Sequence, residues 1–308
     1  MEKYLLTLLG SSVDYFLDSD TYPDEGDFSH SRYLGSFAGG CPLNVGAVCS
    51  SKNVSVKALD LLGINDPTTP FLLEKMREFG FDTSPIRYDE NTTNGKVVII
   101  ITGDKRTMHV IDPIRPYYIV DERMQELMND ATYIYSLMHM IHRSFDSIDY
   151  LKMAKKHGAK IILDGSSKYD DPSRTQILYD LADGLFINKT DYERLKKVSD
   201  GEPYEIILNN DGAFVAVTDG SHGTHLYTKS GSFFAESLSD ISVIDSTGAG
   251  DAFAGCFIAS LLSGYDYEKA LRMASINGAY ACTVFGAQGG MASFEELLHF
   301  AKEHGYEL

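Results

Sequence analysis

A glycine-bearing turn followed by a carboxylate stands in the segment Val243–Phe257, VIDSTGAGDAFAGCF. The turn contains Gly248, Ala249 and Gly250. Asp251 follows directly, and the small apolar residues after it predict a helix. The first amides of a helix lack intrahelical partners and carry partial positive charge, so this turn suits an anion. A carboxylate beside it could remove a proton from an alcohol during phosphoryl transfer. The alternative is a capped helix with an ordinary first-turn aspartate.

A second turn of this kind lies nearer the amino terminus, in the segment GGCPLNVGAVCS. Pro42 suits the first turn of a helix, because its missing N–H would be unpaired there anyway. The pair Gly39 and Gly40 lets a ligand approach the backbone, and Asn44 offers a donor and an acceptor to a hydroxyl-rich ligand. Asp14, at the predicted end of the first strand, could accept hydrogen bonds from two hydroxyls. A plain strand-to-helix turn is the alternative explanation for the glycine pair.

The charge balance excludes two classes of partner. The chain has 308 residues, with 27 Lys and Arg against 44 Asp and Glu, and a formal net charge of −17. Nucleic acids and anionic membrane surfaces attract proteins with a positive field, so neither is expected as a partner. Any phosphate must therefore be held by local devices such as the two turns.

Length and hydrophobicity predict one large domain over residues 1–308, since a chain this long can bury a sizeable core. No run approaches the ~18 apolar residues of a membrane span, and the amino terminus shows no cleavage-site pattern. The cysteines show no CxxC spacing and sit among small apolar residues, which predicts free thiols in a reducing cytoplasm. They are Cys41, Cys49, Cys256 and Cys282.

Short β-rich runs alternate with amphipathic helical segments along the chain. The strand candidates are Tyr4–Leu9, Val54–Leu59, Thr132–Leu137, Lys160–Leu163, Gly184–Ile187 and Ala213–Thr218. The helix candidates are Phe71–Phe79, Ile148–Lys156, Thr175–Leu181 and Glu268–Val284. This alternation predicts an α/β fold with a mainly parallel central sheet and helices on both faces. Ligands of such sheets bind at the carboxyl ends of the strands, often at a helix amino terminus.

Two segments interrupt this alternation. Asn94–Ile101 and Arg106–Ile111 flank a polar turn and predict a hairpin, whereas Asp18–Leu34 is polar, aromatic and loop-like. We expect lid segments at approximately residues 15–36 and 90–112 to form a small β lid beside the main sheet. Because exposed edge strands need cover, we also expect this lid to pair with its copy in a homodimer.

These motifs together resemble the ribokinase-like (PfkB) carbohydrate and nucleoside kinases, along nearly the whole chain. The amino-terminal motif of that family is similar to Gly39-Gly40-x-x-x-Asn44. Its carboxyl-terminal signature, DTxGAGD, is similar to Asp245–Asp251, with Ser246 in place of the usual threonine. Its nucleotide-binding turn is similar to Val217–Gly223, and its late Gly-Ala-Gln loop to Gly286-Ala287-Gln288.

The resemblance implies a ribokinase-like fold and a kinase activity that depends on ATP and Mg²⁺. The γ-phosphate would pass in line to a primary hydroxyl of a small ribose- or fructose-like sugar, with Asp251 as general base. The helix amino terminus would favour the ionised form of Asp251. A nucleoside kinase of the same fold and a low-activity sugar or nucleotide sensor are the alternatives.

The resemblance also implies a role for each matching residue. The amides of Gly248, Ala249 and Gly250 would form an anion hole. The acceptor hydroxyls would be held by Asp14, Gly39, Gly40 and Asn44. The nucleotide would be bordered by Asn188, Thr218, Gly220, Gly223 and Asn277.

Metal ions complete the implied site. The family motif Asn-x-x-Glu, tied to Mg²⁺ and phosphate, appears here as Asn188-Lys189-Thr190-Asp191. Aspartate is one methylene shorter, so Asp191 is expected to act on Mg²⁺ through a water. The ligands of a monovalent cation, K⁺, would come from Asp245, Thr247, Ala281 and Gly286. Some members complete that cation site with a serine where this chain has Gly290.

Overall fold

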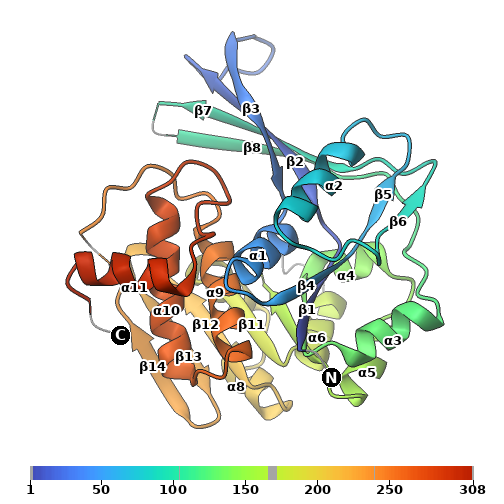
Figure 1. The fold of residues 1–308 in the computed structure, drawn as a ribbon, viewed down its shortest axis with the longest axis vertical. Helices are drawn as coiled ribbons and strands as arrows, with labels where there is room; N and C mark the ends of the chain where they lie inside the picture. Colours follow the sequence, from blue (N-terminus) through green and yellow to red (C-terminus); the bar gives the residue numbers. More distant parts are fainter. Residues whose placement is uncertain (1–2, 104, 166–171, 239, 307–308) are drawn as a thin grey trace.

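An eight-stranded sheet forms the centre of the molecule, in the order β14-β13-β12-β11-β10-β9-β1-β4 (Figure 1). The computed structural model describes residues 3–103, 105–165, 172–238 and 240–306. The strands are β1 (Tyr4–Leu8), β4 (Ser55–Leu59), β9 (Tyr133–Leu137), β10 (Lys160–Asp164), β11 (Gly184–Asn188), β12 (Phe214–Thr218), β13 (Thr224–Thr228) and β14 (Gly231–Ala235). The first six are parallel and confirm the six predicted strands. The antiparallel strands β13 and β14 were not predicted.

Helices cover both faces of this sheet, as predicted for the fold class. One face carries α1 (Cys41–Ser50), α2 (Thr69–Glu78), α9 (Ala249–Leu262), α10 (Tyr267–Cys282) and α11 (Phe294–Glu303). The other carries α3 (Glu122–Asp130), α4 (Met138–Ser144), α5 (Asp149–Lys156), α6 (Pro172–Leu181), α7 (Lys189–Lys197) and α8 (Pro203–Asn209). Successive strand residues alternate between the two cores, so Leu5 packs under α1 and Leu6 on the opposite face. Because both faces are covered, these strands read as continuous apolar runs.

The state of the cysteines and the character of the helices were both predicted from composition. All four cysteines are free thiols, with Cys49 and Cys256 buried and Cys41 and Cys282 half-buried. Among the described residues, none of the helices combines the length and the apolar composition that crossing a bilayer requires.

A second, smaller sheet stands beyond the main sheet, at the top of the view in Figure 1. Its order is β3-β2-β7-β8, and we call it the small sheet. Its strands are β2 (Ser12–Ser19), β3 (Ser31–Gly39), β7 (Gly95–Thr102) and β8 (Lys105–Ile111). The predicted hairpin is confirmed as β7 and β8. A further pair, β5 (Leu61–Gly63) and β6 (Arg87–Asp89), connects β4 with this region.

The sequence prediction was wrong about how the chain enters the small sheet. The predicted loop Asp18–Leu34 is extended strand at both ends, because β2 and β3 pair along their lengths with one bulge between Phe16 and Leu17. Asp14 does not end the first strand either. The chain turns out of the main sheet at Leu9 and Gly10, whose φ angles are 51° and 106°, so that Asp14 lies within β2.

The helix α1 packs closely against the amino-terminal half of α9, and this contact brings the two glycine-bearing turns together. A Cβ atom at Gly255 of α9 would lie 2.7 Å from both the Val45 oxygen and the Val48 Cβ of α1. The Cys49 thiol of α1 also donates a hydrogen bond to the Gly255 carbonyl oxygen, at 3.1 Å. No side chain fits at Gly255 unless the two helices move apart.

Substitution of Gly255 by alanine should therefore destabilise the fold. We expect the free energy of unfolding to fall by about 1–2 kcal/mol, the overpacking cost less the gain in helix propensity. Urea denaturation followed by circular dichroism measures this change. The control is Gly278→Ala in α10, where a Cβ would meet the nearest atom at 3.4 Å, an ordinary contact. An equal effect of both substitutions would contradict the packing argument.

Candidate active site

A hydrogen bond between α1 and α9 lies at the centre of the site. Asn44 Nδ2 donates to Asp251 Oδ2 at 2.8 Å. Each residue lies near the start of its helix, just after the turn that contains Gly40 or Gly248. Gln288 holds Asn44 from the other side, donating to Asn44 Oδ1 at 3.2 Å and to the Ala38 carbonyl oxygen. The two motifs that the sequence singled out are therefore parts of one site.

Asp14 joins this site from β2. Its carboxylate is buried and accepts a hydrogen bond from Ser12 Oγ at 2.8 Å. A Cβ atom at Gly39, the last residue of β3, would overlap the Asp14 carboxyl group. Glycine at position 39 is thus required for the carboxylate to lie there. Asp14, Gly39, Gly40 and Asn44 are brought together as predicted.

The start of α9 has the geometry of a backbone anion site. Gly248 is the N-cap residue with a φ of 76°, a left-handed conformation that favours glycine. A Cβ there would also overlap the Ala287 carbonyl group. The Ala249 amide donates to the Ser246 carbonyl oxygen at 3.3 Å, a long and therefore weak hydrogen bond. The amides of the first helical turn precede the intrahelical ladder, and their partial charge favours an anion.

Burial is the largest influence on the pKa of Asp251 and raises it, whereas the sequence analysis expected the helix amino terminus to favour the ionised form. Burial, and to a smaller extent the carboxylates of Asp164 and Asp14, raise its pKa to about 6, against the hydrogen bonds from Asn44 and Cys41. Burial likewise raises the pKa of Asp14 to about 6. One pH unit is a factor of about ten in proton occupancy, so both groups remain mostly ionised at pH 7.

Asp164 is a residue of this site that the sequence analysis missed. It ends β10 at the carboxyl edge of the main sheet, and Tyr135 Oη lies 3.5 Å from its Oδ2. Its charge raises the pKa of Asp251 and of Tyr135, where burial is the larger cause. Its position in the sequence could have identified it: Asp164 directly follows the predicted strand Lys160–Leu163, and ligands of parallel sheets bind at the carboxyl ends of the strands.

A pocket of about 450 Å³ lies beside the start of α9. Its walls include the predicted nucleotide residues Thr218, Gly220 and Gly223, from the turn between β12 and β13, together with Ala249 and Gly250. The other walls are largely apolar, with Leu238, Ile241, Val243, Phe253 and Ala279. An apolar pocket next to a helix amino terminus suits a nucleotide, with its base in the pocket and its phosphates at the helix.

Asn277 is not part of this pocket. Its side chain is fully buried, donates to the Ala252 carbonyl oxygen at 2.8 Å and accepts from Lys52 Nζ at 3.4 Å. It therefore holds α9 and α10 together, and the structure does not place it beside a nucleotide. Asn188, by contrast, lies opposite Thr218 in the strand register and caps α7 by accepting from the Asp191 amide at 2.8 Å.

Asp191, the predicted magnesium residue, is already engaged on both carboxylate oxygens. Oδ1 accepts from Arg194 at 2.8 Å and Oδ2 from Asn188 Nδ2 at 2.7 Å. The described residues contain no cluster of three His, Cys, Asp or Glu side chains that could hold a metal ion. The described residues therefore offer no all-protein cage for Mg²⁺, an ion that usually binds through one or two carboxylates and the phosphates of a nucleotide.

The predicted ligands of the monovalent cation surround Asp245. Its buried carboxylate accepts from the Thr247 amide at 2.9 Å, the Thr247 hydroxyl at 2.7 Å and the Gly286 amide at 3.0 Å. Burial opposes the charge of Asp245. These hydrogen bonds and the nearby Arg106 outweigh that effect and lower its pKa. Ala281 is the penultimate residue of α10.

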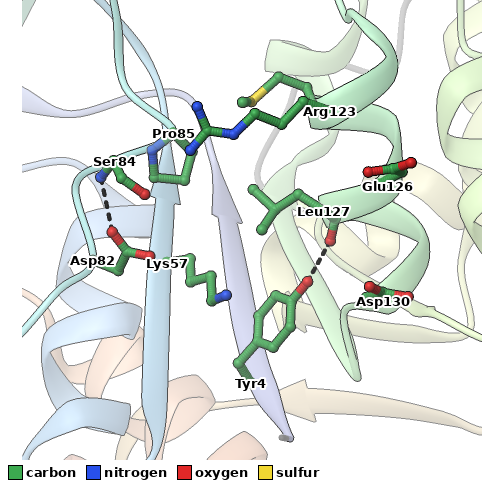
Figure 2. A pocket seen from close by; sticks show the side chains of 10 residues that line it. Tyr4, Lys57, Asp82, Ser84, Pro85, Arg123, Glu126, Leu127 and Asp130 are labelled. Carbon is green, nitrogen blue, oxygen red and sulfur yellow. Dashed lines mark hydrogen bonds between the residues drawn. The ribbon is translucent and has the colours of Figure 1, made fainter. Parts of the chain in front are cut away.

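Another hollow, of about 370 Å³, lies at the opposite end of the main sheet (Figure 2). It is lined by Tyr4, Lys57, Asp82 and Arg123, among others, and Tyr4 Oη donates to the Leu127 carbonyl oxygen at 2.5 Å. Tyr4 begins β1, so this hollow faces the amino end of that strand, away from Asp251. The carboxyl edge remains the candidate active site.

The chain matches the pfkB family carbohydrate kinases over residues 5–293. It is 21% identical to a nucleoside kinase of Methanocaldococcus jannaschii, with 99% of this chain and 98% of that protein covered. It is 25% identical to an ATP-dependent 6-phosphofructokinase of Thermoanaerobacterium thermosaccharolyticum, with 93% and 90% covered.

Solved structures share the fold. The ribokinase of Arabidopsis thaliana complexed with ribose and ATP has a TM-score of 0.83 at 22% identity, covering 98% of this chain and 99% of that one. A fructokinase with bound ATP from Xylella fastidiosa has a TM-score of 0.81 at 19% identity, covering 97% and 98%. With its two glycine-bearing turns joined at Asn44 and Asp251, the chain belongs to the pfkB family carbohydrate kinases and is an ATP-dependent kinase.

Proposed function

We propose that this kinase transfers the γ-phosphate of ATP to a primary hydroxyl of a small, uncharged, ribose- or fructose-like sugar. The position of Asp251 carries the proposal. Asp251 lies at the start of α9, bordered on one side by the pocket at Ala249 and Gly250 and bound on the other by Asn44. A carboxylate placed between a nucleotide pocket and a hydroxyl-binding group suits a general base.

In this proposal each part of the site has one task. Asp14, Gly39, Gly40 and Asn44 hold the acceptor hydroxyls, and Asp251 accepts the proton of the reacting hydroxyl. The amides of Gly248, Ala249 and Gly250 neutralise charge on the transferring phosphoryl group. Thr218, Gly220 and Gly223 border the nucleotide, next to Asn188. Mg²⁺ bound with ATP supplies further charge neutralisation at the phosphates.

The charge of the site supports an uncharged acceptor. The charges of Asp164 and Asp14 both contribute to raising the pKa of Asp251, after burial, so three carboxylates lie close together here. Carboxylates accept hydrogen bonds from hydroxyls and repel phosphate or carboxylate groups. A nucleoside is the second candidate, because it is uncharged too and one relative is a nucleoside kinase. An ADP-release assay over pentoses, ketohexoses, nucleosides and sugar phosphates tests this proposal, and turnover with sugar phosphates alone would contradict it.

Asp251→Asn separates a catalytic role from a structural one. The amide keeps the shape and can still accept a hydrogen bond from Asn44, but it cannot take a proton at useful pH. We expect kcat to fall by on the order of 10²–10⁴-fold, with ATP affinity close to wild type. In the wild type, kcat should fall below about pH 6, as Asp251 becomes protonated.

The same variant should be at least as stable as the wild type at pH 7.5. Because folding raises the pKa of Asp251 to about 6, ionisation costs stability as the pH rises from about 4 to about 6. Removing the charge should raise the melting temperature at pH 7.5 and have a smaller effect at pH 5. Near-wild-type kcat together with a lower melting temperature would indicate a helix-capping role instead.

We further propose that Asp191 acts on Mg²⁺ through a water. Asp191→Ala should shift the Mg²⁺ dependence of the initial rate to higher concentration, whereas Asp191→Glu should be tolerated. Arg194→Ala is the control, because it removes the ion pair and keeps the carboxylate. An unchanged Mg²⁺ profile for Asp191→Ala would remove Asp191 from the site.

We also propose that the small sheet is the lid and that two copies pair through it in a homodimer. The support is its exposed apolar surface: Tyr33, Met108, Val110 and Ile111 are 58%, 62%, 69% and 50% exposed. Its edge strands β3 and β8 offer unpaired backbone groups. The four free thiols are consistent with the reducing cytoplasm expected from the sequence.

Val110→Asp should dissociate this dimer, since a charge on the paired apolar face is unfavourable. Sedimentation velocity at micromolar concentration should give a dimer for the wild type and a monomer for the variant. Leu298→Asp on α11, at a residue 48% exposed, is the control and should remain dimeric. A monomeric wild type would contradict the proposal.

A further inference from the structure

An arginine of the small sheet reaches the loop that precedes the glycine-bearing turn of α9. Arg106, on β8, places Nη1 2.5 Å from Asp245 Oδ1 and Nη2 3.1 Å from Ser246 Oγ. The side chain of Asp245 is only 5% exposed and that of Arg106 28% exposed. The ion pair is thus largely removed from water, where charge interactions are stronger than at the surface.

This arginine occupies the carboxylate that the family resemblance assigns to a monovalent cation. Asp245 Oδ1 accepts from Arg106 and from the amide and hydroxyl of Thr247, while Oδ2 accepts from the Gly286 amide. Arg106 is the charged donor among them, so its guanidinium competes directly with a cation for this carboxylate.

The carbonyl oxygens of two other implied ligands each accept one hydrogen bond and keep a second lone pair. The Ala281 carbonyl oxygen accepts from the Val284 amide at 3.3 Å, and the Gly286 carbonyl oxygen accepts from the Gly289 amide at 3.2 Å. The serine that completes the site in some family members has no counterpart, because a Cβ atom at Gly290 would overlap the Ala252 Cβ. With Arg106 bound to Asp245, the residues present therefore do not fit a monovalent cation in the way the resemblance implies.

A second positive charge beside the guanidinium would be repelled. Arginine remains protonated at any pH at which the enzyme works, so its charge is a permanent part of the site. We propose that Arg106 takes the place of the monovalent cation at Asp245, so that phosphoryl transfer by this kinase does not depend on K⁺.

The contact makes Arg106 a positioning residue. It acts on Asp245, which in turn holds Thr247 directly before Gly248 and the first amides of α9. The guanidinium thus fixes the approach to the proposed anion hole without touching it. Because Arg106 belongs to the small sheet, the same contact joins that sheet to the loop of Asp245 and Ser246, which precedes α9.

The first experiment compares salts on the wild-type enzyme. The inference rests on the kinase activity, so kcat is measured with the acceptor identified by the ADP-release assay, in KCl, NaCl and tetramethylammonium chloride at equal ionic strength. We expect the three rates to agree within about twofold, the scatter of salt effects on exposed charges. Activation by K⁺ of more than about fivefold over tetramethylammonium would overturn the proposal.

The second experiment uses variants of the arginine. Arg106→Ala should lower kcat about tenfold in tetramethylammonium chloride, as losses of outer-shell partners do. Guanidinium or K⁺ should restore part of that rate, because the space beside Asp245 can then take a small cation. Arg106→Lys keeps the charge, and its kcat should lie between those of the wild type and Arg106→Ala. Arg272→Ala, which breaks an exposed ion pair on α10, is the control and should behave like the wild type.

A melting measurement separates this inference from the choice of acceptor, since it needs no substrate. Replacing tetramethylammonium by K⁺ should leave the melting temperature of the wild type unchanged and raise that of Arg106→Ala. If Arg106→Ala loses stability only, with normal kcat in every salt and no response to guanidinium or K⁺, then Arg106 is merely a structural fastening and the proposal is wrong.

Discussion

The close contact between α1 and α9 is the constraint on which the rest of the site depends. Gly255 lets the two helix axes approach until backbone meets side chain, and Asn44 then reaches Asp251. Each helix begins at a glycine-bearing turn, so the approach places two sets of helix-start amides together. A wider spacing would leave each turn as an ordinary strand-to-helix connection. The position of Asp251 beside Asn44 therefore depends on small residues that let the two helices pack closely.

That packing also determines the electrostatics. Burial raises the pKa of Asp14 and Asp251 to about 6, which is the range in which a carboxylate can both exist as a base and accept a proton readily. The same burial makes their charges unfavourable for the folded state. Asp245 shows the opposite arrangement, because backbone amides, a hydroxyl and a guanidinium compensate its charge. Asp251 and Asp245 thus differ in how many donors surround their carboxylates.

Much of this could be predicted from local sequence. The six parallel strands were identified because their apolar runs indicate burial. The hairpin and the two glycine-bearing turns were identified because glycine, proline and asparagine have strong local conformational preferences. The strands β2 and β3 were missed because their stability comes from pairing with each other and with β7, which no local pattern records. Asp164 had a local signal, its place directly after a predicted strand, whereas the contact of Arg106 with Asp245 joins segments that are far apart in the sequence. Motif position does not reveal which way a helix residue points, and the Asn277 side chain lies buried between α9 and α10, outside the walls of the pocket.

The order of the chain separates recognition from transfer. The residues proposed to grip the acceptor lie within Asp14–Asn44, carried by the small sheet and α1, whereas those proposed to handle the nucleotide and the phosphoryl group lie beyond Asn188. Substitutions on the small sheet, such as at Asp14, should therefore disturb the proposed phosphate-binding residues less than substitutions of Asn44, which binds Asp251. Such a division lets one scaffold diversify its alcohol substrates, and relatives of this chain are kinases named for a nucleoside, a hexose phosphate and ribose 1-phosphate. In this proposal the antiparallel pair β2 and β3 carries Asp14 and Gly39, and thereby determines which acceptor is bound.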